Sequence, residues 1–80
     1  MAALEIVIAY PPAGDDEDVA LALARRLFAV LDVAIDSLTL APAAGGDLTV
    51  HLNGRLVYAR SQAGRPPRVT DVTERLNRAG

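Results

Sequence analysis

The strongest structural signal in this chain is the segment Asp47-Leu48-Thr49-Val50-His51-Leu52-Asn53-Gly54-Arg55-Leu56-Val57-Tyr58-Ala59-Arg60. Leu48, Val50 and Leu52 alternate with polar residues, as in a strand with one buried face. The Asn53-Gly54 pair that follows accepts the positive φ angles of a type I′ turn. We therefore predict a β-hairpin with strands over residues 48–52 and 55–60.

The alternation assigns the hairpin side chains to two faces. In a two-residue turn Leu52 pairs with Arg55, and the faces follow from that register. The predicted core face carries Leu48, Val50, Leu52, Val57 and Ala59. The predicted outer face carries Thr49, His51, Leu56, Tyr58 and Arg60. On the outer face, Leu56, Tyr58 and Arg60 form a candidate surface for a protein partner or for a second copy of the chain.

Residues 4–31 predict a strand followed by a helix. The run from Leu4 to Tyr10 is short, rich in β-branched residues and ended by Pro11-Pro12, which cannot donate to a sheet ladder. Four acidic residues at 15–18 then suit the first turn of a helix that ends near Leu31. Its apolar stripe has the spacing of one helical face: Ala20, Leu23, Ala24, Leu27, Phe28 and Leu31.

The rest of the chain predicts one more strand and one more helix. Apolar alternation over 33–40 slips once near Asp36-Ser37, which indicates a bulged strand. Glycine and proline mark a loop at 41–46, and 61–67 is predicted to be a loop as well. A last helix begins at a cap formed by Thr70 or Asp71. Its stripe is Val69, Val72 and Leu76.

The predicted element order is βαβββα, in one domain that spans residues 1–80. The fold class is an α/β (α+β) two-layer sandwich, in which a four-stranded mixed sheet is covered on one face by both helices. The first two strands can be parallel because the first helix supplies their crossover.

Composition excludes several classes of function. A net charge of −2 and a pI near 5.1 argue against binding to nucleic acid or to an anionic membrane. The first residues lack a basic signal region and no apolar run is long enough to span a bilayer, so we expect a cytoplasmic protein. Four arginines, at 55, 60, 65 and 68, either protect the hairpin edge or form a surface for an acidic partner.

Candidate catalytic and metal-binding residues are few. His51 is the only histidine, and no ligands cluster near it in the sequence. The acids at 15–18 splay around a helix axis instead of converging on a cation. Ser37 and Ser61 lack a neighbouring base. We therefore predict no metal, no cofactor and no catalytic residue.

Three parts of the chain resemble the Rdx family. They are the strand Glu5-Ile6-Val7-Ile8-Ala9-Tyr10 before a tight loop, the segment from Gly45-Gly46 through the hairpin to Arg60, and the later Gly64 and Pro66. The small thioredoxin-like proteins of this family include selenoprotein W. The resemblance implies a thioredoxin-like βαβββα fold. It also implies Cys-x-x-Cys, or selenocysteine at the second position, directly after the tyrosine that ends the first strand.

In this chain those positions hold Pro11-Pro12-Ala13-Gly14, and none of the 80 residues is a cysteine. Thiol–disulfide activity therefore cannot be carried over. We expect a redox-inactive, non-catalytic protein-interaction module that contacts an unidentified protein, or a second copy, through Tyr10, Pro11, Pro12, Ala13 and Gly14. Two alternatives stay open: a small-ligand binder or enzyme with non-thiol chemistry, and a subunit of a redox complex whose partner supplies the cysteines.

Overall fold

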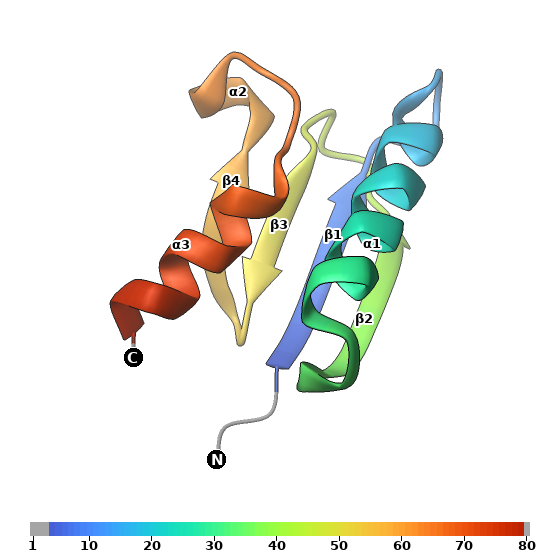
Figure 1. Ribbon diagram of the computed structural model, residues 1–80. Coiled ribbons are helices and arrows are strands. Elements are labelled where there is room, and N and C mark those ends of the chain that lie inside the picture. Colours follow the sequence, from blue (N-terminus) through green and yellow to red (C-terminus); the bar gives the residue numbers. More distant parts are fainter. Residues whose placement is uncertain (1–3, 80) are drawn as a thin grey trace.

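The computed structural model describes residues 4–79, with the side chains of residues 4–76 (Figure 1). Its elements are the strands β1 (Leu4–Tyr10), β2 (Ile35–Pro42), β3 (Thr49–Leu52) and β4 (Arg55–Ala59), the helices α1 (Asp16–Leu31), α2 (Arg60–Ala63) and α3 (Val69–Ala79), and the 3-10 turn η1 (Asp32–Ala34). The predicted order of strands and long helices is confirmed. The short helix α2 lies where we predicted the end of a strand and the start of a loop.

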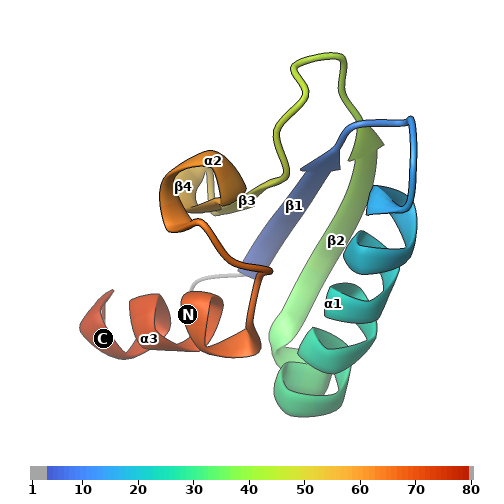
Figure 2. The same cartoon turned by 90° about the horizontal axis from the view of Figure 1, so that it is seen from above.

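The four strands form one mixed sheet in the order β2-β1-β3-β4. β1 and β2 are parallel and α1 connects them, as predicted, while β3 pairs antiparallel with both β1 and β4. Figures 1 and 2 show α1 and α3 on the same side of the sheet, with α1 over β1 and β2 and α3 near β4. No helix among residues 4–79 covers the opposite face.

The core lies between this sheet and the two long helices. Its fully buried side chains are Ile6, Ile8, Leu23, Leu27, Leu48, Val50 and Val72. The predicted stripe of α1 is confirmed for Ala20, Leu23, Ala24 and Leu27, but Phe28 is 48% exposed and was wrongly placed in the core. One residue advances a helix by about 100°, so Phe28 turns away from the sheet on which Leu27 packs.

The predicted bulge in the second strand is confirmed at Asp36. Leu4 is opposite Ile35 but Glu5 is opposite Ser37, so one residue of β2 is left unmatched. β2 starts later and ends later than predicted, since Val33 lies in η1 with 93% of its surface exposed and residues 41–42 continue the strand.

The hairpin turn is also confirmed, with positive φ at Asn53 and Gly54 and with Leu52 opposite Arg55. The register then shifts, because His51 pairs with Leu56 but Val50 pairs with Tyr58. The shift leaves Val57 as an extra residue, in the manner of a β-bulge. Tyr58 therefore faces the core and is only 4% exposed, so its predicted place on the outer face was wrong.

Candidate functional site

Loop 10–14, defined as Tyr10 to Gly14, connects the end of β1 to the start of α1. Tyr10 and Pro11 are half-buried, and the next three residues are exposed. The Tyr10 carbonyl accepts a hydrogen bond from the Ala43 amide, which fixes the start of the loop to the segment after β2. Gly14 has φ +83°, a conformation that favours glycine. The loop thus presents a rigid apolar surface, and its residues 11–14 hold no nucleophilic side chain.

An ion pair joins the start of α1 to the hairpin. Arg60 Nη1 and Nη2 donate to the two carboxylate oxygens of Asp16 at 2.6 and 3.1 Å. This hydrogen bonding from Arg60 holds the pKa of Asp16 below its ordinary value. Arg60 therefore lies on the helix side of the sheet, beside the acidic turn that follows loop 10–14, and not on the outer face where we predicted it.

The candidate partner surface of Leu56, Tyr58 and Arg60 is therefore not assembled. Leu56 is 43% exposed on the outer face, opposite His51, whereas Tyr58 is buried in the core. Because of the bulge at Val57, the strand alternation that grouped these three side chains does not hold beyond Leu56. Only Leu56 remains exposed on the predicted side.

The loop before β3 is tied to α2. Ser61 donates both its amide and its hydroxyl to the Asp47 carboxylate, at 3.0 and 2.7 Å, and these bonds, led by the one from the hydroxyl, lower the pKa of Asp47. The Arg60 amide donates to the Leu48 carbonyl at 2.9 Å. The hydroxyl of Ser61 thus serves to hold α2 in place.

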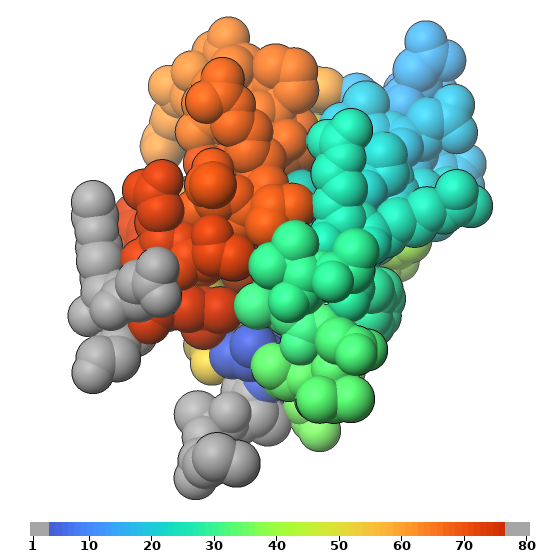
Figure 3. All heavy atoms as spheres, viewed as in Figure 1, coloured from blue at the N-terminus to red at the C-terminus, as the bar shows by residue number. Residues whose placement is uncertain are grey.

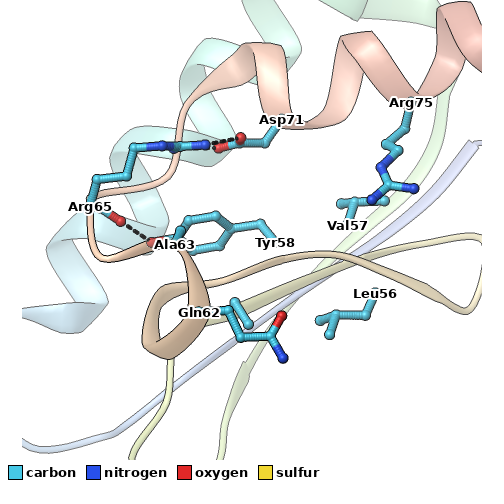
Figure 4. A pocket seen from close by; sticks show the side chains of 9 residues that line it. Leu56, Val57, Tyr58, Gln62, Ala63, Arg65, Asp71 and Arg75 are labelled. Atoms are coloured by element: carbon cyan, nitrogen blue, oxygen red, sulfur yellow. Dashed lines mark hydrogen bonds and ion pairs between the residues drawn. The ribbon is translucent and has the colours of Figure 1, made fainter.

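A cavity of about 240 Å³ lies between β4 and α3 (Figure 4). The Tyr58 hydroxyl donates to the Arg65 carbonyl, and the Arg65 guanidinium lies 5.8 Å from the centre of the Tyr58 ring. Both terminal nitrogens of Arg65 also donate to Asp71, at 3.0 and 2.5 Å. Burial raises the pKa of Tyr58, and the bonds from Arg65 lower the pKa of Asp71.

Asp71 is the third residue of α3 and also accepts a hydrogen bond from the Arg68 amide at 2.8 Å, as the acid of a capping box does. The helix begins at Val69, so the predicted start at Thr70 or Asp71 was wrong, although Asp71 does bond a backbone amide at this helix end. The pairing of Asp71 with Arg65 was not predicted. The sequence signal for this pairing was an arginine, Arg65, that lies shortly before the acidic residue Asp71 at the start of the last helix. The polar groups of Tyr58, Arg65 and Asp71 bond to one another or to the backbone, which makes this cluster a clamp between β4 and α3.

The two ion pairs also change the interpretation of the four arginines. Arg60 and Arg65 bind carboxylates of the same chain. A surface for an acidic partner would therefore depend on Arg55 and Arg68.

The structure groups no metal ligands within the described part of the chain, where no three histidine or acidic side chains come together. His51 is half-buried in β3 between Val7 of β1 and Leu56 of β4. Within residues 4–79, no helix has the length and apolar character needed to cross a bilayer.

Comparison with known proteins identifies relatives for this fold. A crystal structure of a protein from Bordetella parapertussis matches with a TM-score of 0.84 and 22% identity, over 99% of this chain and 100% of the other. A crystal structure of a selenoprotein W-related protein from Vibrio cholerae matches with a TM-score of 0.85 and 22% identity, over 98% of each chain. These matches confirm the predicted thioredoxin-like fold.

No curated protein matches the chain. The model of the Rdx family, however, matches residues 5–78, which is nearly the full length. The match includes loop 10–14, where Pro11 and Gly14 stand at the positions that the resemblance assigned to the redox pair. The chain therefore belongs to the Rdx family, as a member without cysteine.

Proposed function

We propose that this protein is a non-catalytic interaction module that contacts another protein chain through loop 10–14. The observation that carries the proposal is the character of the loop: it is apolar, exposed from Pro12 to Gly14, and fixed at its start by the bond between Tyr10 and Ala43. A rigid surface loses little conformational entropy when a partner binds.

The absence of cysteine removes the chemistry that the family resemblance implies for this position, and no other group in loop 10–14 replaces it. The Tyr58 cavity gives less support to a small-ligand function, because its hydroxyl, guanidinium and carboxylate already bond within the chain. For these reasons the interaction module is favoured over an enzyme with other chemistry.

The test is quantitative affinity capture from the extract of the native cell. The bait is the full chain, compared with Ala13→Asp, which places a charge on the exposed loop. Glu74→Arg, on the exposed side of α3, is the matched control for a surface charge change. We expect Ala13→Asp to lose the captured chain and the control to retain it. Equal capture by all three proteins would contradict the role of the loop.

A further inference from the structure

The side of α1 that points away from the sheet exposes apolar side chains. Among the described residues, six large apolar side chains are exposed, and four of them lie on α1 and η1: Leu21, Phe28, Val30 and Val33. Leu21 is 40% exposed and Phe28 48%. The space-filling view shows this side of α1 open to solvent (Figure 3). Leu21 and Phe28 are seven residues apart and therefore lie on the same side of α1. Apolar groups gathered on one exposed side often mark a contact with another chain.

Charged residues flank the apolar part of this face. One row of residues at helical spacing is called the α1 stripe here: Asp18, Leu21, Ala22 and Arg25. Together with Arg26, these residues line a hollow of about 370 Å³. Asp18 and Arg25 are two turns apart, about 10.5 Å along the axis, which is too far for an ion pair within the helix. Neither forms an ion pair anywhere among the described residues.

The α1 stripe is self-complementary, because it begins with an acid, has a large and a small apolar residue at its centre, and ends with a base. A two-fold axis between two antiparallel copies sets Asp18 against the partner's Arg25. The same axis sets Leu21 against the partner's Ala22, whose small side chain lets the two helices approach closely. Each contact is repeated on the other side of the axis, as in any isologous interface.

We propose that a second copy of this chain docks on the α1 stripe through antiparallel packing of the two α1 helices. The same pairing continued outward brings Phe28 opposite the partner's Asp15, beside the exposed Ala13-Gly14 end of loop 10–14. The inference rests on the proposed function, because it identifies a second copy as the chain that loop 10–14 contacts.

Charge reversal tests this geometry, because the two-fold axis determines which charged residues of the two copies face each other. Asp18→Arg leaves arginine at both charged positions of the α1 stripe, and Arg25→Asp leaves aspartate at both. Each single variant turns both intermolecular attractions into repulsions, so we expect its dimer dissociation constant to rise about tenfold or more. The double variant exchanges the two charges and restores both attractions, so its constant should return to within about threefold of the original.

A mixture of the two single variants provides the sharpest test. The two arginines of one variant meet the two aspartates of the other, so the mixture should form a heterodimer although each variant alone is a monomer. Neither residue has a charged neighbour in the helix whose loss would explain this result, since Arg25 has none three or four positions away and Asp18 has only the like-charged Asp15.

The measurement is sedimentation equilibrium over a range of concentrations, with thermal melts to show that each variant is folded. Arg55→Glu, a charge reversal at the distant hairpin turn, is the matched control and should leave the dimer unchanged. A wild-type chain that stays monomeric at the highest concentration would overturn the inference. So would single variants that dimerise as well as the wild type, or a folded mixture that forms no heterodimer.

Failure of the inference is distinguishable from failure of the proposed function. If the charge variants do not behave as expected while capture of another chain still depends on Ala13, the loop remains an interaction site and only the second copy is wrong. If the charge variants behave as expected but Ala13→Asp changes neither the dimer nor capture, the α1 contact stands and the role of the loop falls.

Discussion

The clamp between β4 and α3 can be tested by Asp71→Asn. Asp71 accepts three hydrogen bonds, two from Arg65 and one from the Arg68 amide, and its side chain is only 13% exposed. The amide of asparagine keeps one acceptor oxygen and has no charge. The variant therefore loses the bidentate ion pair with Arg65 and keeps at most part of the helix cap.

The expected cost follows from these bonds. A hydrogen bond to a charged group contributes about 1.5–3 kcal/mol, and a helix cap about 0.5–2 kcal/mol. Because Arg65 is 35% exposed and water can replace part of what it loses, we expect the free energy of unfolding to fall by about 2 kcal/mol in total. For a domain of this size that corresponds to a melting temperature lower by roughly 10 °C.

The pH dependence gives an independent check. The bonds from Arg65 hold the pKa of Asp71 below its ordinary value, so the folded state binds fewer protons than the unfolded state near that pKa. The stability from Asp71 is therefore complete above the unfolded pKa of about 3.9 and is lost as the pH falls through the lower folded pKa. The difference between wild type and Asp71→Asn should be constant from pH 7 to 5 and shrink below about pH 4.

Urea unfolding at a series of pH values measures this difference. Glu74→Gln is the matched control, because Glu74 is an exposed acid of the same helix for which the structure shows no hydrogen bond. It should change stability by less than about 0.5 kcal/mol. The reasoning is refuted if Asp71→Asn is as stable as this control at pH 7, or if its deficit persists unchanged at pH 2.

Three further predictions concern other parts of the chain. Tyr58→Phe removes the hydroxyl that bonds the Arg65 carbonyl and should lower the free energy of unfolding by about 1 kcal/mol in the same urea assay; an unchanged midpoint would contradict the bond. Asp32→Gly should raise stability by about 1 kcal/mol, because Asp32 adopts φ 45° and ψ −118°, and a calorimetric melt at or below the wild-type temperature would argue against strain there. Pro11→Cys with Gly14→Cys should yield only a weak oxidoreductase with little thiolate at neutral pH, so rapid insulin reduction by this variant would count against that expectation.

The features that the sequence predicted best are those set by neighbouring residues. The turn at Asn53-Gly54 depends on two residues that tolerate positive φ, and the order of strands and helices follows from hydrophobic periodicity over short windows. The bulge at Asp36 was predictable for the same reason, because the apolar alternation itself slips at that point.

The second bulge was not predictable in this way. Leu56, Val57, Tyr58 and Ala59 are all apolar, so either register of β4 buries an acceptable side chain, and local alternation cannot choose between them. In the observed register Tyr58 reaches the Arg65 carbonyl, a contact with a residue that lies beyond the next helix. The wrong face for Tyr58, and with it the unassembled partner surface, both come from this one register shift.

The structure of loop 10–14 adds a backbone constraint to the absence of cysteine. The absence lies at Pro11 and Gly14, directly before the acids at 15–18, whose negative charge would oppose a thiolate. In the structure Asp16 is paired with Arg60, so part of that negative charge is neutralised. The backbone supplies a stronger obstacle, because a cysteine at position 14 would have to adopt the φ of +83° that glycine adopts freely. Restoring the side chains alone would therefore strain the loop at position 14.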